Sequence, residues 1–201
     1  MTRLSHLAIA IGSLLLSACA AQPTNAPSTQ QSWEQQKTAL EALDQWQVQG
    51  KMALRTATES QSASMIWSQR DHVTQLRLSG PLGAAATHIY ADGKILEINR
   101  GGKTDRFDMS SPDTIAAGTG WDLPLRELPR WLLGMPTGDA AVASAVVENN
   151  VLRQFTELGW TVRYEQYGSF DGLSLPVHII IERNESRARL IIRDWTFTRA
   201  P

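Results

Sequence analysis

The only cysteine of the chain, Cys19, is the residue whose position most clearly predicts chemistry. It ends the stretch Leu-Ser-Ala-Cys at 16–19, which follows Arg3 and an almost wholly apolar run over 7–16. These features are typical of a secretory signal peptide, and the run is too short to span a bilayer. Residues 16–19 also match the bacterial lipobox, in which the thiol takes a diacylglyceryl thioether, the chain is cut before the cysteine, and the new amine is acylated. We therefore predict a lipoprotein signal peptide over 1–18 and acylation of Cys19.

No other arrangement of reactive side chains predicts catalysis, metal binding or a cofactor. His72, His88 and His178 lack the spacings of metal ligands, and the carboxylates are scattered. The chain holds no nucleophile elbow, P-loop or dinucleotide-binding glycine motif. We therefore expect no enzymatic activity and no cofactor. The formal net charge of −1, without more than two adjacent basic residues anywhere, also argues against nucleic acid as a partner.

The residues after Cys19 predict a tether. They contain two prolines and many Ser, Thr and Gln, but no large apolar side chain before the tryptophan at 33. Such a segment cannot bury enough surface to fold, so we expect an acylated cysteine and flexible tether over 19–32 and one folded domain over 33–201. Ala20 stands where an Asp would retain a lipoprotein in the inner membrane, which favours a lipid-anchored protein at the outer membrane with its domain facing the periplasm.

Hydrophobic periodicity predicts a mainly β, α+β domain with few helices. A capping-box pattern at 32–35 and helical spacing of large apolar residues predict a helix over 33–45. The period then changes to two, and turn signals such as Asp92-Gly93 and Gly101-Gly102 separate short strands, about six of them before residue 110. A second short helix is predicted over 128–133, and further strands over 151–157, 160–167, 176–182 and 188–195. The sum is a single curved antiparallel sheet with a few small helices.

One turn carries an unexpected apolar residue. The stretch Ser-Gly-Pro-Leu-Gly at 79–83 predicts a tight reversal, with Leu82 at its tip. An apolar side chain at a turn either folds back onto the core or projects outward, and the local sequence leaves both possibilities open.

The whole chain after Cys19 resembles the LolB family of outer-membrane lipoprotein receptors in the Lol pathway. The most specific segments are Gly-Pro-Leu-Gly at 80–83, Arg-Trp-Leu-Leu-Gly-Met-Pro at 130–136, the run from Tyr164 to Tyr167 before a glycine, and Arg-Asp-Trp at 193–195. Pro129 departs from the helical pattern ahead of the second segment, so the length of that helix is left open.

The resemblance implies a fold and a task. The fold would be an open, incomplete β-barrel with a small helical lid over an apolar cavity, as in the periplasmic carrier LolA. The protein would accept triacylated lipoproteins from LolA and insert them into the inner leaflet of the outer membrane, as a monomer and without a cofactor. Leu82 would project from the rim and take part in membrane insertion.

Candidate acyl-chain residues follow from the strand faces and the lid. The inward positions of the early strands are Trp46, Val48, Met52, Leu54, Met65 and Trp67. Lid candidates are Ile115, Trp131 and Leu132, joined by Trp160 from a later strand. Each of these positions would equally suit plain core packing.

Two other functions remain open from the sequence. One is an outer-membrane scaffold lipoprotein that transfers nothing, which would have a filled core. The other is a carrier or sensor of small lipids with the same fold, which would bind free lipid but accept no lipoprotein from LolA.

Overall fold

The computed structural model describes residues 33–80, 86–110, 124–138 and 145–198. The predicted signal peptide and tether, including Cys19, lie outside the described residues, as do Leu82 and Ile115. Within the described part, none of the helices has the length and apolar character needed to span a bilayer.

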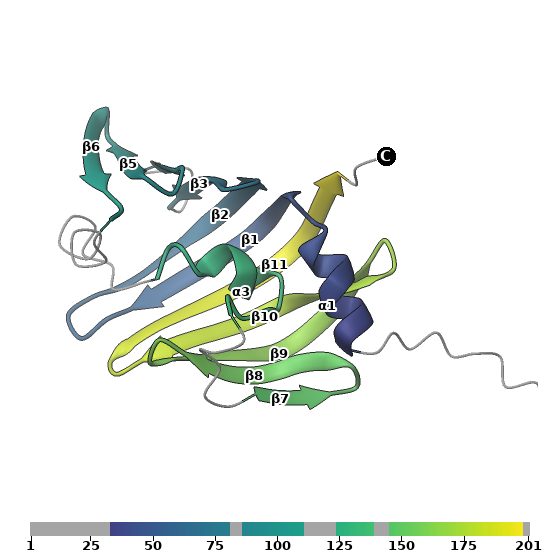
Figure 1. Ribbon diagram of the computed structural model, residues 1–201. Coiled ribbons are helices and arrows are strands. Elements are labelled where there is room, and N and C mark those ends of the chain that lie inside the picture. Colours follow the sequence, from purple (N-terminus) through teal and green to yellow (C-terminus); the bar gives the residue numbers. More distant parts are fainter. Residues whose placement is uncertain (1–32, 81–85, 111–123, 139–144, 199–201) are drawn as a thin grey trace, which may run out of the picture. The chain divides into compact units, whose positions relative to one another are not determined.

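The described strands form one antiparallel sheet (Figure 1). Their order across the sheet is β6-β5-β4-β3-β2-β1-β11-β10-β9-β8-β7, so the first and last strands of the chain pair in its middle. The strands are β1 (Gln45–Arg55), β2 (Ser60–Arg70), β3 (Val73–Ser79), β4 (Thr87–Ala91), β5 (Ile95–Arg100), β6 (Lys103–Asp108), β7 (Ala145–Glu148), β8 (Val151–Glu157), β9 (Trp160–Phe170), β10 (Leu173–Arg183) and β11 (Ser186–Thr198). The predicted single antiparallel sheet is confirmed, with six strands among the described residues before 110.

The alternating sequence pattern places the apolar side chains on one face. In β1 the side chains of Trp46, Val48, Met52 and Leu54 are buried, whereas Lys51 on the opposite side is exposed. We call the side of the sheet that carries the four buried residues the inner face. Because successive residues of a strand point to opposite faces, the two-residue period decides which residues reach the core.

Hairpin turns connect the short strands at the predicted positions. The Asp92 carboxylate accepts the backbone N–H groups of Lys94 and Ile95, both at 2.9 Å, and these hydrogen bonds lower the pKa of Asp92. Gly101 and Gly102 have φ values of +61° and +83°, a backbone conformation that suits glycine and allows a two-residue turn between β5 and β6.

Two helices in the described part of the chain pack on the inner face. Helix α1 (Trp33–Glu41) and helix α3 (Leu128–Leu132) lie over the same side of the sheet (Figure 1). Helix α1 contacts β8 and β10, and the apolar side chains of α3 belong to the core. The predicted extent of 33–45 for the first helix is wrong at its end, because β1 begins at Gln45. Leu43 and Trp46 have helical spacing to Leu40, yet they reach the core from a turn and a strand.

The second helix differs slightly from its predicted bounds, and one edge strand of the sheet was not predicted. Leu133 is the C-cap of α3 and not its last residue, and Pro129 lies in the first turn, where its missing N–H costs no helical hydrogen bond. Strand β7 was not predicted, because all four of its residues are exposed and it therefore shows no buried alternation.

Gly50 holds the central strand pair β1–β11 together. It lies at an irregularity in the register after Gln49, and a Cβ atom at this position would overlap the backbone carbonyl oxygen of Ile191. The close approach of the two strands therefore requires glycine.

We expect Gly50→Ala to lower the free energy of unfolding by about 1–3 kcal/mol, the usual cost of overpacking against an unyielding neighbour. Gly138→Ala is the matched control, because a Cβ there meets no atom within 4 Å. Urea unfolding followed by tryptophan fluorescence measures both variants. An equal loss of stability in both would show that the strand approach does not exclude a side chain.

Candidate functional site

Four of the predicted cavity residues form a packed aromatic and sulfur cluster on the inner face. Trp46, Val48, Met65 and Trp67 are each 4% exposed or less. The rings of Trp46 and Trp67 lie 6.4 Å apart and nearly parallel, and Trp46 also contacts Trp195 with a centroid distance of 5.4 Å. The structure thus places these residues in the core of the inner face, where their side chains are in contact with one another.

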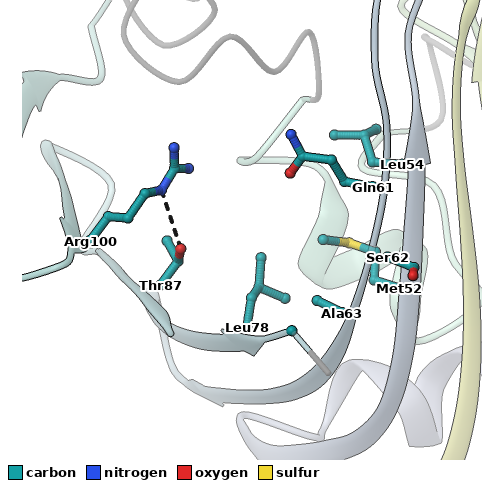
Figure 2. A pocket seen from close by; sticks show the side chains of 9 residues that line it. Met52, Leu54, Gln61, Ser62, Ala63, Leu78, Thr87 and Arg100 are labelled. Carbon is teal, nitrogen blue, oxygen red and sulfur yellow. Dashed lines mark hydrogen bonds between the residues drawn. The ribbon is translucent and has the colours of Figure 1, made fainter. Parts of the chain in front are cut away.

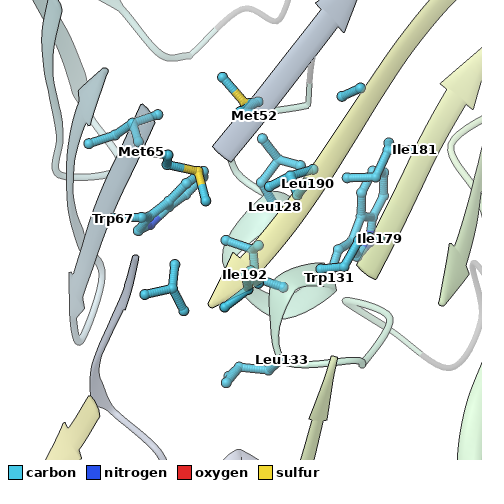
Figure 3. Packing of buried hydrophobic residues seen from close by; sticks show 14 of the residues in the cluster. Met52, Met65, Trp67, Leu128, Trp131, Leu133, Ile179, Ile181, Leu190 and Ile192 are labelled. Atoms are coloured by element: carbon cyan, nitrogen blue, oxygen red, sulfur yellow. The ribbon is translucent and has the colours of Figure 1, made fainter. Parts of the chain in front are cut away.

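The predicted lid residues Trp131 and Leu132 belong to α3 and are fully buried. Figure 3 shows Trp131 beside Ile179 and Ile181 of the sheet, while Leu128 lies near Leu190. Trp160, at the start of β9, is 1% exposed and has the guanidinium of Arg183 over its ring at 4.5 Å. Helix α3 is therefore packed onto the inner face through large apolar side chains.

A buried carboxylate fixes α3 to the sheet. Glu157, at the end of β8, is 1% exposed and accepts the indole N–H of Trp131 at 2.7 Å. It also accepts the backbone N–H of Thr137 at 3.0 Å and the Thr137 hydroxyl. The Tyr164 hydroxyl donates to the Trp131 carbonyl oxygen at 2.7 Å. Buried polar groups stabilise a structure only when they are paired, and here each of these groups has its partner.

Other residues of the segment 130–136 form contacts that account for their residue types. Arg130 donates to the Pro136 carbonyl oxygen at 2.9 Å and forms an ion pair with Glu41 of α1 at 3.1 Å. Gly134 ends the helix with φ +87°, and a side chain there would crowd Pro176 and Tyr167. The motif thus ties α3 to α1 and to the sheet.

Glu127 and Tyr164 are two of the ionisable groups in this region whose pKa is shifted by burial. Burial raises the pKa of Glu127, and the negative charge of Glu157 raises it further. Burial also raises the pKa of the Tyr164 phenol, which therefore stays neutral and donates its hydrogen bond to Trp131. Both shifts follow from the cost of placing charge in an apolar interior.

A cavity opens on the inner face where β1, β3 and β5 end and β2 and β4 begin, away from Trp46 and Trp67. It has a volume of about 390 Å³, and we call it the rim cavity. Its lining residues are Met52, Leu54, Gln61, Ser62, Ala63, Leu78, Gly80, Thr87 and Arg100. Figure 2 shows Met52, Leu54 and Gln61 on one side and Arg100 with Thr87 on the other. Gly80 directly precedes the segment 81–85, which contains Leu82.

The structure divides the predicted acyl-chain residues into two groups. Met52 and Leu54 line the rim cavity. The second group packs in the core and consists of Trp46, Val48, Met65, Trp67, Trp131, Leu132 and Trp160. Of these, Trp46 also borders a second hollow near the other end of β1. The part played by any of them in binding acyl chains stays a prediction. Among the described residues, no group of His, Cys, Asp or Glu side chains could hold a metal ion.

Sequence reasoning missed Glu157, Arg100 and Thr87. The local signal for Glu157 is its position two residues after Phe155, a buried residue of the same strand. Arg100 likewise continues the spacing of Leu96 and Ile98, so the period of two marks it as an inward residue. Charged residues at inward positions were the available signal in both cases.

Comparison with known proteins agrees with this geometry. Residues 44–195 match the family described as outer membrane lipoprotein LolB. An outer-membrane lipoprotein LolB from Stutzerimonas stutzeri (strain A1501) is 31% identical over 200 residues, which cover 97% of each chain. The LolB of Chromohalobacter salexigens is 32% identical and covers 90% of this chain and 85% of its own.

The fold also occurs in a distant solved structure. The crystal structure of a DUF1329 family protein from Desulfovibrio piger aligns with a TM-score of 0.55 at 8% identity, covering 82% of this chain and 90% of that one. At such low identity the similarity concerns the fold alone. The family match and the full-length relatives decide the family: this chain belongs to the outer membrane lipoprotein LolB family.

Proposed function

We propose that this chain is a lipoprotein receptor of the outer membrane, which accepts acylated lipoproteins from the carrier LolA and passes them into the inner leaflet. The observation that carries the proposal is the rim cavity, an apolar hollow on the inner face in a chain of the LolB family. The cavity provides a sheltered surface for acyl chains, and the transfer needs no catalytic residue and no cofactor.

The hydrophobic effect explains why such a receptor is needed. Three acyl chains of roughly fifteen methylenes each, at ~0.8 kcal/mol per methylene, would cost tens of kcal/mol to expose to water. They must therefore pass from one apolar cavity to another. Without an energy source, each step must lead to a state of lower free energy, and insertion into the bilayer is the last of them.

Accepting three chains would require the inner face to open. The rim cavity lies near the lower end of the ~300–1,000 Å³ range of small-molecule sites, which is less than three chains occupy. The proposal therefore includes separation of core side chains that adjoin Met52 and Leu54. The methionines Met52 and Met65 suit this role, because their unbranched side chains adapt to differently shaped neighbours.

The amino-terminal segment would keep the receptor at its membrane. Acylation of Cys19 would anchor the chain, and a tether of about thirteen residues, if flexible as predicted, would have an end-to-end distance of roughly 20 Å. The folded domain would then act as a monomer in the periplasm, within reach of both the LolA–lipoprotein complex and the bilayer surface.

A transfer assay tests this proposal. LolA loaded with a labelled lipoprotein is mixed with the full chain carrying Cys19→Ala, which removes the acylation site, and liposomes are then added. The proposal requires the label to move first to this protein and then to the liposomes. If the label stays on LolA while this protein is folded, the chain is no receptor, and a scaffold or a carrier of small lipids is the better interpretation.

Filling the rim cavity should abolish acceptance. Ala63 lines the cavity from β2, so Ala63→Trp is expected to reduce transfer from LolA at least tenfold by occupying the space of an acyl chain. Ser64→Trp is the matched control, because Ser64 is exposed on the opposite face of the same strand. Equal transfer to both variants, with the same urea midpoint, would show that acyl chains bind elsewhere.

A further inference from the structure

Arg100 brings a positive charge to the inner face at the end of β5. It follows Leu96 and Ile98 at two-residue spacing, and both of those side chains are buried. Its cross-strand partner on β4 is Thr87, a buried residue whose hydroxyl accepts a hydrogen bond from the Arg100 Nε–H at 3.3 Å. The bond to Thr87 orients the guanidinium, and its terminal nitrogens have no hydrogen-bond partner among the described residues.

In the described part of the chain, no carboxylate forms an ion pair with Arg100. Lys103 of β6 lies opposite Arg100 in the strand register. The carboxylate of Asp105 forms an ion pair with Lys103 at 2.9 Å. The carboxylate of Glu97, also on β5, is paired with another residue, because it accepts a hydrogen bond from Arg106 at 2.8 Å. Among the described residues, the rim beside Arg100 therefore carries the two positive charges of Arg100 and Lys103 against the one negative charge of Asp105.

This charge faces an apolar wall. Figure 2 shows the guanidinium of Arg100 across the rim cavity from Leu54 and Gln61, with Leu78 and Ala63 between the two sides. A cavity with apolar walls and a few convergent polar donors fits an amphiphile. The acyl chain would contact Met52, Leu54 and Leu78, while an oxygen atom of its head group would accept hydrogen bonds from Arg100.

We propose that Arg100, oriented by Thr87, forms a polar subsite of the rim cavity that binds a carboxylate or carbonyl oxygen at the head of an acyl chain. This inference deepens the proposed function and rests on the cavity being a lipid site. Guanidinium is suited to the task, because it is always charged and presents several donors in one plane. Hydrogen bonds from a charged donor are also stronger than those between neutral groups.

Three ligands with the same chain length test the head-group preference. Laurate offers a carboxylate, methyl laurate a neutral ester carbonyl, and dodecyltrimethylammonium a cation without an acceptor oxygen. Their dissociation constants for the full chain carrying Cys19→Ala are measured by displacement of the neutral probe N-phenylnaphthylamine. Laurate and dodecyltrimethylammonium are kept below their micellar concentrations, and methyl laurate is kept below its solubility limit. We expect laurate to bind at least about tenfold more tightly than the cation.

Arg100→Gln should weaken laurate about tenfold and methyl laurate about threefold, and leave dodecyltrimethylammonium unchanged or improved. Arg77→Gln is the matched control, since Arg77 is an exposed residue that β3 directs to the opposite face, and it should change none of the three affinities. Arg100→Lys keeps the charge but not the planar donors, and should give an intermediate loss for laurate. It also serves as the second variant if Arg100→Gln does not fold.

The outcomes separate this inference from the proposed function. Equal weakening of all three ligands by Arg100→Gln, or no weakening of laurate, would overturn the subsite even if lipoprotein transfer from LolA succeeds. Arg100-dependent selectivity for laurate would support the subsite even if no lipoprotein were accepted, and the receptor proposal alone would then fall. The absence of any ligand binding to the unaltered cavity would overturn the subsite, and the transfer assay alone would then decide the receptor proposal.

Discussion

Leu82→Glu is expected to abolish delivery of lipoproteins to the membrane while leaving their acceptance from LolA intact. Entry of one leucine side chain into the bilayer stabilises the membrane-bound form by roughly 1.5–3 kcal/mol, which is enough to orient a cavity mouth but too little to anchor a protein. A glutamate at the same place must instead lose its hydration on entering the apolar region of the bilayer. Entry of this side chain into the bilayer is therefore unfavourable. The labelled lipoprotein should then accumulate on the receptor and fail to reach liposomes.

The chain offers a matched control for this prediction. Leu158 lies in the turn between β8 and β9 and is 56% exposed, so Leu158→Glu places the same charge at a leucine that the structure shows to be exposed. It should leave delivery unchanged. Leu82→Met, which keeps a large apolar side chain, should deliver normally. Normal delivery by Leu82→Glu, or an equal defect in Leu158→Glu, would remove Leu82 from the proposed mechanism.

The second large effect is expected from Glu157→Ala, which should lower the free energy of unfolding by about 3–5 kcal/mol. The carboxylate accepts hydrogen bonds from the Trp131 indole and from the backbone of Thr137, and all of these groups lie in or beside the core. Its removal leaves buried donors without a partner and a void beneath α3. Urea unfolding should show a lower midpoint with an unchanged slope.

Two controls define the cause of that loss. Glu148→Ala removes an exposed carboxylate from the neighbouring strand β7 and should change stability by less than ~0.5 kcal/mol. Thr137→Val removes only the hydroxyl donor and should cost less than Glu157→Ala, because the backbone N–H and the indole keep their acceptor. A small effect of Glu157→Ala would mean that apolar packing alone holds α3 on the sheet.

Much of the sheet was predictable because its determinants are local. In β1 and β2 a period of two separates buried from exposed side chains, and glycine-containing turns mark where the chain reverses. The same local reasoning failed between Leu40 and Trp46. Their spacing suits a helix, but the pairing of β1 with β2 and β11 extends the sheet to Gln45 and overrides it.

The candidate site was less predictable, because contacts between distant segments divide the apolar inward residues. Met52 and Trp67 share the same alternating pattern, yet Met52 lines the rim cavity and Trp67 packs against Trp46. The difference depends on which residues of α3 and of the later strands cover each position. No periodicity within β1 or β2 carries that information.

The sequence by itself determined the lipobox at Cys19, the strand faces, most turns and the resemblance to the LolB family, since each of these depends on neighbouring residues or on their order. Only the tertiary structure decided that Glu157 accepts the Trp131 indole N–H from 26 residues away. It also decided that Arg100 and Thr87 meet at the edge of an apolar cavity. The physical reason is that hydrogen-bond partners and cavity walls come from strands and helices that only folding brings together.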